Sequence, residues 1–128
     1  NIELAADILL MSQISISGTG VIIDGKGFKL DGNNNVGCLS IQMYAEVTLT
    51  NLVITRGNTE NGGGLNINSA TVIMTYCTIS ENTATFGGGV YICYSATVTM
   101  ASCTITSNTA TSNGGGVYIC YSATVTMA

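Results

Sequence analysis

The residues of this chain that could carry out acid–base or metal chemistry gather in its first third. Asp24 and Asp31 flank the stretch GKGFKL, which contains Lys26. Two carboxylates and an amine that meet at one corner of a fold could bind a divalent cation or pair a general acid with a general base. The two DG pairs are also typical of tight turns, and we favour this interpretation. We therefore predict no catalytic residue, no metal site and no cofactor.

Charged side chains are scarce elsewhere in the sequence. The 128 residues include three basic and seven acidic side chains, no histidine and a net charge of −4 at pH 7. Arg56 stands alone near an expected loop, and we interpret it as a solvated charge. Because no basic cluster is present, the composition argues against nucleic acid as a partner. No apolar run approaches the roughly 20 residues of a membrane span.

An internal repeat indicates which structural elements position the charged residues. The segment GGGVYICYSATVTMA occurs at Gly87–Ala101 and again at Gly114–Ala128. A related copy begins at Gly62, so successive copies are offset by 25 and 27 residues. Fainter copies lie upstream, and the chain therefore consists of about five turns of one unit. Within each unit apolar and polar residues alternate, which is typical of half-buried β-strands.

Three short strands per unit, separated by glycine, asparagine and serine, predict one coil of a parallel β-helix. A single coil cannot cover its own apolar face, whereas coils stacked about 4.8 Å apart bury a continuous core. A β-propeller is the competing architecture, but each of its blades needs roughly 40 residues or more. We therefore predict an all-β solenoid, with residues 1–128 as a single β-helix segment.

Glycine and asparagine are expected to form the corners of the coils. Asn82 and Asn108 occupy matching positions, where stacked side-chain amides could bond along the solenoid axis. Ligand-binding loops are the alternative, but repetition in every clear coil favours a structural role. Three glycine triplets supply positions that tolerate positive φ and close approach of neighbouring coils: Gly62, Gly63, Gly64, Gly87, Gly88, Gly89, Gly114, Gly115 and Gly116.

The segments VIIDGKGFKLDG, CTISENTAT and GGGVYI, at their fixed spacing, resemble a known family of repeats. They are similar to the right-handed parallel β-helix repeats of pectin-lyase-like surface and exported proteins, including the polymorphic outer-membrane autotransporters. This resemblance implies a right-handed coil and an extracellular or cell-surface location. Polysaccharide lyases of this fold resemble one another in using clustered carboxylates that hold calcium and a basic residue. The fold carries both enzymes and passive rods, so the resemblance leaves the activity open.

Rows of threonine form one candidate contact surface. Thr97 and Thr99 are expected to point outward and to stack on Thr124 and Thr126 of the next coil. Such Thr-x-Thr rows raise the alternative of an ice-binding face, with spacings of about 6.7 Å along a strand and about 4.8 Å between coils. Ile73 interrupts the rows in the preceding coil, and threonine is a common outward residue of strands. The ordinary strand interpretation is therefore favoured.

Rows of tyrosine form a second candidate contact surface. The repeat stacks two outward pairs of rings, Tyr91 on Tyr118 and Tyr94 on Tyr121. In the preceding coil we assign Asn66 and Asn68 to the places of Tyr91 and Tyr94. Exposed aromatic rows can bind sugar rings or a partner chain, and they can equally cover backbone by packing between coils. Both interpretations remain open.

The five cysteines fall into two equivalent pairs and one single residue. Cys77 and Cys103 point inward by the alternation and are expected to be small core residues. Cys93 and Cys120 follow buried isoleucines and are expected outside or at a corner, where a disulfide between stacked coils is feasible in an exported protein. Cys38 has no partner at its own position and is expected to be buried.

Neither end of the sequence shows the polar or helical cap that normally closes a solenoid. We interpret residues 1–128 as an uncapped part of a longer rod or as a subunit that stacks end to end into a filament. The predicted function is a non-catalytic extracellular structural or adhesive solenoid, whose partner is a second copy or the remainder of a longer chain. Two alternatives are a module that binds or processes cell-surface polysaccharide and an ice-binding solenoid.

Overall fold

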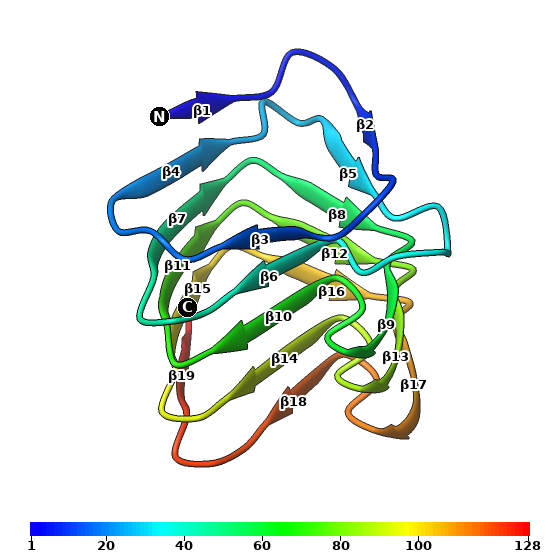
Figure 1. The fold of residues 1–128 in the computed structure, drawn as a ribbon, viewed down its shortest axis with the longest axis vertical. Helices are drawn as coiled ribbons and strands as arrows, with labels where there is room; N and C mark the ends of the chain where they lie inside the picture. Colours follow the sequence, from blue (N-terminus) through cyan, green and yellow to red (C-terminus); the bar gives the residue numbers. More distant parts are fainter.

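The computed structural model describes residues 1–128 and contains only β-strands and connections. It has no helix of the length and hydrophobicity required to cross a membrane. Strands that follow one another in the chain belong to different sheets, and strands that pair in a sheet are parallel. The chain thus winds as a solenoid of five coils, and β19 begins a sixth (Figure 1). The predicted all-β parallel β-helix is confirmed.

Four parallel sheets run along the solenoid axis and are called A to D below. Sheet A contains β1 (Ile2–Glu3), β4 (Val21–Asp24), β7 (Glu46–Thr50), β11 (Thr71–Thr75), β15 (Thr97–Ala101) and β19 (Thr124–Met127). Sheet B contains β2 (Ile8–Leu9), β5 (Lys29–Asp31), β8 (Val53–Thr55), β12 (Thr78–Ser80) and β16 (Thr104–Thr106). Sheet C contains β3 (Ile14–Ile16), β6 (Leu39–Ile41), β10 (Leu65–Asn68), β14 (Val90–Cys93) and β18 (Val117–Ile119). Sheet D contains β9 (Asn58–Asn61), β13 (Thr83–Phe86) and β17 (Thr109–Asn113).

Sheets A, B and C supply the three expected strands of each coil, and sheet D adds a short fourth strand to three coils. The segments of sheet D were expected to be corners because they contain asparagine and lie beside the glycine triplets. In the structure their threonines adopt extended conformations, and Thr83 pairs with Asn58 on one side and Thr109 on the other. This pairing satisfies backbone groups that a loop would leave to solvent.

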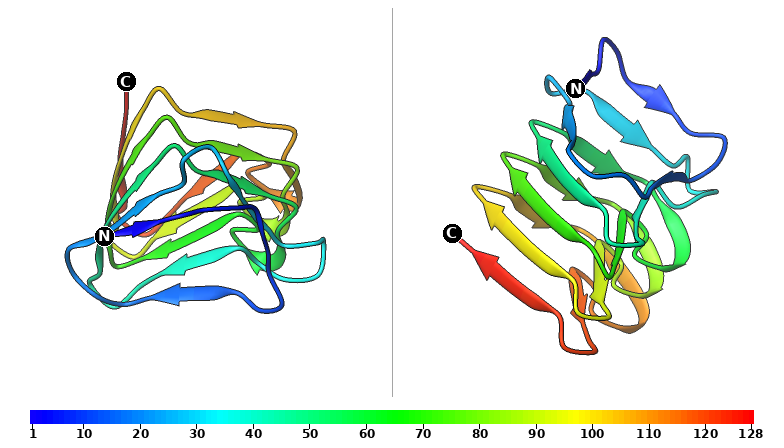
Figure 2. Two further views of the ribbon diagram at one scale, coloured as in Figure 1. Left: turned by 90° about the horizontal axis from the view of Figure 1, so that it is seen from above. Right: turned by 60° about the vertical axis from the view of Figure 1, so that its left-hand side comes forward.

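The core is a column of aliphatic side chains enclosed by the coils, with 23 residues in one buried cluster. In β7 the inward Val47 and Leu49 are buried, whereas the outward Glu46 is exposed. Equivalent residues repeat the pattern one coil later, where Val72 and Met74 lie in register with this pair. The coils stack along one axis (Figure 2), and the register of sheet A aligns Val47, Val72 and Val98 in one inward row.

The glycine triplets bring neighbouring coils into backbone contact. The first glycine of each triplet has a positive φ, 65° at Gly62, 64° at Gly87 and 72° at Gly114. A Cβ added to Gly88, the second glycine of its triplet, would overlap the carbonyl oxygens of Thr109 and Gly115 in the next coil. Only glycine therefore allows the coils to pack at this spacing.

Asparagine side chains bond along the axis at the corner that follows sheet B. Asn82 is fully buried, and its Oδ1 accepts the N–H of Gly57 at 2.7 Å. Its Nδ2 donates to the carbonyl oxygen of Ile54 and to Oδ1 of Asn108, both at 3.1 Å. Asn108 repeats the arrangement by donating to the carbonyl oxygen of Ile79 at 2.9 Å. The two amides thus link three successive coils.

Candidate binding surface

The acidic and basic residues selected from the sequence do not meet at one corner. Asp24 ends β4, and its Oδ2 lies 3.4 Å from Nζ of Lys26, which also lies 3.6 Å from Oε2 of Glu3. The N–H of Lys26 donates to Oδ1 of Asp24 at 2.9 Å. Asp31 ends β5 at the following corner, where it pairs with Arg56 instead. The N–H of Asn33 also donates to Oδ1 of Asp31 at 2.8 Å, so each aspartate accepts a hydrogen bond within its own turn, as the favoured interpretation expects.

The electrostatics at Asp24 oppose a role for Lys26 as a general base. The hydrogen bond from the backbone of Lys26 lowers the pKa of Asp24, and the carboxylate of Asp24 raises the pKa of Lys26. A lysine that takes a proton at neutral pH needs a lowered pKa. Both groups remain charged near pH 7, so they form an exposed ion pair.

Arg56 is not the isolated solvated charge that we expected from the sequence. Its Nε donates to Oδ1 of Asp31 at 2.9 Å and its Nη2 donates to Oδ2 at 2.7 Å. The pKa of Asp31 is lowered, mainly because the guanidinium of Arg56 donates these hydrogen bonds. The expectation failed because the two residues are 25 positions apart, and only the coil spacing brings them together. Their two-point contact connects β5 to the segment after β8.

Both tyrosine stacks form, but only one of them is exposed. The rings of Tyr91 and Tyr118 lie 5.6 Å apart and those of Tyr94 and Tyr121 lie 4.9 Å apart, with interplanar angles of 13° and 12°. Tyr91 retains only 7% of its accessible surface, so its predicted exposure is wrong. Tyr118 covers one of its faces, and Phe86 packs on Tyr118 at 5.3 Å. Burial also raises the pKa of Tyr91.

The register corrects the expected equivalence of Asn68 and Tyr94. Asn66 does pair with Tyr91, but Asn68 lies beside Cys93. The corner after β14 contains two residues, Tyr94 and Ser95, whereas the corner after β10 contains Ser69 alone before the buried alanine. Tyr94 thus has no counterpart in the preceding coil. The sequence indicated a missing residue, because the offset from Gly62 to Gly87 is 25 residues and the next offset is 27 residues.

A groove of about 690 Å³ lies over this shortened corner. Ser69, Ala70 and Thr71 form its floor, and the corners of the neighbouring coils form its walls. One wall carries Tyr44 and Glu46, which the sequence analysis did not single out. The opposite wall comes from the two following corners and consists of Tyr94, Ser95, Tyr121 and Ser122. Tyrosine, serine and one glutamate thus contribute to the lining of the groove from successive corners of the solenoid.

The threonine rows lie in register on the outer face of sheet A. Thr97 pairs with Thr124 and Thr99 pairs with Thr126. The row through Thr99 continues to Ile73, whose side chain is exposed. The outer face of sheet A therefore mixes hydroxyl and aliphatic side chains.

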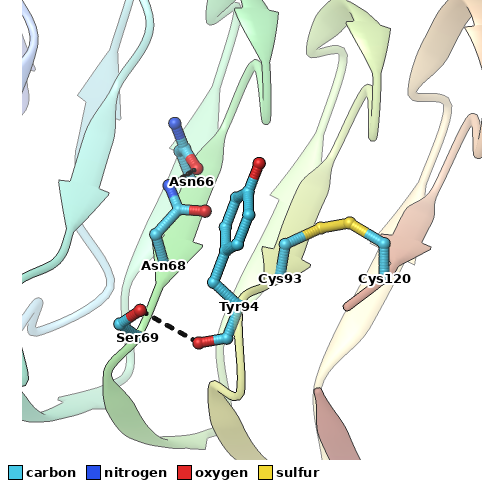
Figure 3. The surroundings of a disulfide bond; sticks show 6 residues. All are labelled: Asn66, Asn68, Ser69, Cys93, Tyr94 and Cys120. Carbon is cyan, nitrogen blue, oxygen red and sulfur yellow. Dashed lines mark hydrogen bonds between the residues drawn. A yellow bond between two sulfur atoms is a disulfide. The ribbon is translucent and has the colours of Figure 1, made fainter. Parts of the chain in front are cut away.

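The disulfide that the repeat register made feasible is present between Cys93 and Cys120 (Figure 3). The two Cα atoms are 4.6 Å apart, as expected for equivalent residues of stacked coils. Cys93 ends β14 at the expected corner and lies outside the core cluster, but neighbouring side chains and the disulfide leave it fully buried. It lies at the end of β14 between Asn68 and Cys120, beside Tyr94 (Figure 3). The bond covalently joins β14 to the segment after β18.

The other three cysteines are free thiols. Cys38 and Cys77 are buried, and Cys103 is half-buried against the core. Burial raises the pKa of Cys38 to about 12 and that of Cys77 to about 11. The thiols donate to backbone carbonyl groups, for example Cys38 Sγ to the oxygen of Thr55 at 3.4 Å. Cys38 and Cys77 are therefore protonated core side chains at neutral pH.

Comparison with protein families gave one result that covers nearly the whole chain. A family model described as "Right handed beta helix region" matches residues 10–128. Comparisons with curated proteins and with solved structures gave no significant match.

Proposed function

We propose that this chain, which belongs to the right-handed β-helix family, serves outside the cell as a non-catalytic structural or adhesive solenoid. The observation that carries the proposal is that its chemically capable side chains connect one coil to the next. Asp31 binds Arg56, Asn82 binds Asn108, and Cys93 is bonded to its counterpart in the next coil. Each contact strengthens the stack along its axis, as a load-carrying rod requires.

An extracellular or cell-surface location is supported by the disulfide. Disulfides persist in oxidising compartments and are rare where thiols are kept reduced. The bond between Cys93 and Cys120 is partly buried and lies within a rigid stack of strands. In this proposal the disulfide holds the coils together outside the cell, where cytosolic chaperones are absent.

The partner in this proposal is a second copy or further coils of the same chain. Two isoleucines on the outer face of sheet A, Ile22 and Ile73, remain 40% and 47% exposed. Exposed aliphatic side chains on one sheet face favour lateral contact between solenoids. We expect self-association in analytical ultracentrifugation that weakens when Ile73 is replaced by lysine. Association that is unchanged by this substitution would contradict lateral contact through sheet A.

The non-catalytic role is tested by assaying turnover of a panel of plant, algal and bacterial polysaccharides. We expect no new reducing ends and no unsaturated uronic acids with the wild-type chain. Turnover by the wild-type chain that disappears in Asp24→Ala or Asp31→Asn, but not in the matched surface variant Glu60→Gln, would overturn the proposal. It would assign an acid–base function to those aspartates and favour a polysaccharide-processing module.

The register of the threonine rows favours one second candidate, an ice-binding face on sheet A. Thr97, Thr99, Thr124 and Thr126 form two neighbouring rows across two coils. This candidate predicts thermal hysteresis that falls when Thr99 is replaced by lysine. A wild-type chain without thermal hysteresis would end it.

A further inference from the structure

We infer that Tyr94 and Tyr121 are a site of oxidative cross-linking, at which a one-electron oxidant joins the two rings as dityrosine. The cross-link adds a second covalent bond between two neighbouring coils, beside the disulfide. This inference goes beyond the structural role proposed above and does not depend on it. Three observations carry the inference: the stacking of the two rings, the way their backbones are held, and their exposure.

The two rings lie face to face at close range. Their centroids are 4.9 Å apart and their planes differ by 12°. A nearly parallel stack at this spacing keeps the carbons next to the two hydroxyl-bearing carbons close to one another. These are the ring carbons that share the unpaired electron of a tyrosyl radical and form the bond of dityrosine. The stack therefore brings together the atoms that couple.

The backbone holds both tyrosines in this arrangement before any oxidant acts. Each of them directly follows one half of the disulfide between Cys93 and Cys120, whose Cα atoms are 4.6 Å apart (Figure 3). On the other side, the N–H of Ser95 donates to the carbonyl oxygen of Tyr121 at 2.8 Å. Groups fixed side by side react at a high effective concentration, so coupling within one chain is faster than coupling between chains.

Exposure distinguishes this pair from the other tyrosine stack. Tyr94 is 50% exposed and Tyr121 is 66% exposed, so an oxidant can reach both rings. The rings must also turn and approach until a carbon–carbon bond of about 1.5 Å forms, and their exposure leaves room for this motion. In the other stack the centroids are 5.6 Å apart, Tyr91 is 7% exposed, and Phe86 packs on Tyr118. Close packing there opposes coupling.

The oxidant for this reaction is hydrogen peroxide, used by a haem peroxidase that takes electrons one at a time. Each tyrosine loses one electron and its hydroxyl proton and becomes a phenoxyl radical. A bond forms between one ring carbon of each radical, and the hydrogen on each of these carbons moves to the phenolic oxygen of its own ring, which restores both aromatic systems. The two electrons and two protons reduce one hydrogen peroxide to two water molecules. The product is the chain without two hydrogen atoms.

The test treats the folded, disulfide-bonded chain with a haem peroxidase and hydrogen peroxide. We expect dityrosine fluorescence in the monomer fraction of a denaturing gel filtration, in a yield that does not change with protein concentration. After reduction of the disulfide, the chain is digested with thermolysin, because Arg56 is its last basic residue and trypsin would not separate the two tyrosines. Tandem mass spectrometry should find Tyr94 linked to Tyr121. A link between Tyr91 and Tyr118 instead, or dityrosine confined to dimers, would overturn the inference.

Variants that lack one hydroxyl group locate the reaction. Tyr121→Phe keeps a ring in the stack but cannot form a phenoxyl radical, and it should lower the yield of dityrosine in the monomer by at least about tenfold. Tyr76→Phe is the matched control, because Tyr76 is 64% exposed and has a φ of 54°, against 48° at Tyr121. Tyr118→Phe removes a hydroxyl group from the other stack. Both of these variants should keep the full yield, and a loss in either one equal to that in Tyr121→Phe would overturn the assignment.

A second readout follows from the resistance of dityrosine to reducing agents. Once the disulfide is reduced, the peroxidase-treated chain should keep a higher urea midpoint than the untreated chain, because the link between the rings still closes the same loop. Tyr121→Phe treated in the same way is the control, and its midpoint should be that of the untreated, reduced chain. Equal midpoints for the treated wild-type chain and the treated variant would show that the two rings are not joined.

Discussion

The buried amide of Asn82 offers the sharpest test of how the coils are held together. Replacing Asn82 with alanine leaves the N–H of Gly57 without an acceptor in a fully buried position. It also removes the hydrogen bonds that Asn82 Nδ2 donates to Ile54 and to Asn108. The variant thus loses contacts to the coil before and the coil after.

The expected loss of stability follows from these three bonds. A buried backbone N–H left without a partner costs about 1–3 kcal/mol, and each further lost hydrogen bond costs about 1 kcal/mol. We therefore expect the free energy of unfolding to fall by about 3–5 kcal/mol in Asn82→Ala. Asn58→Ala is the matched control, because Asn58 is exposed and its Nδ2 makes one bond, to Asn34 at 3.1 Å. Its cost should stay below about 1 kcal/mol.

Urea unfolding followed by tyrosine fluorescence measures both variants. The midpoint should shift strongly for Asn82→Ala and little for Asn58→Ala, with the slope unchanged in each case. A loss below about 1 kcal/mol for Asn82→Ala, equal to that of the control, would refute the reasoning. It would mean that the asparagine stack adds nothing beyond the strand pairing.

Three further predictions concern side chains that link or fill the coils. Cys93→Ser combined with Cys120→Ser should lower the free energy of unfolding by about 3–4 kcal/mol for a loop of this length, whose ends are 27 residues apart; an unchanged urea midpoint would contradict this. Because the folded pKa of Asp31 is lowered from 3.8, its stabilisation is complete above that value and is lost as the pH falls through the folded pKa. Arg56→Gln should raise the NMR-measured pKa of Asp31 and flatten this acid dependence, and an unmoved pKa would exclude the ion pair. Since burial raises the pKa of Cys38 to about 12, a disulfide reagent at pH 8 should modify its thiol only after unfolding; rapid reaction of the folded chain would contradict its burial.

The fold could be predicted because its signals are short-range and repeated. Alternation of apolar and polar residues identifies strands, and the repeat length identifies a β-helix instead of a propeller. The disulfide was predictable for the same reason. Two identical segments place Cys93 beside Cys120 once the coils stack in register.

Other features depended on how unequal coils fit together. Tyr91 alternates to the outer face, yet Tyr118 covers it, and periodicity does not report such packing. Arg56 binds Asp31 of the neighbouring coil, 25 positions away in the sequence. The groove depends on a corner at Ser69 that is one residue shorter than the next. The sequence interpretation placed Asn68 at the position of Tyr94 and so did not recognise the missing residue. Its position becomes clear only from the strand register.

The most direct test of the central proposal is immunogold electron microscopy of the producing cells, with an antibody raised against this solenoid. The proposal predicts gold particles along extended rods or fibres at the cell surface or in the surrounding matrix. Labelling confined to the cytoplasm, or to compact particles that turn over polysaccharide after purification, would contradict it.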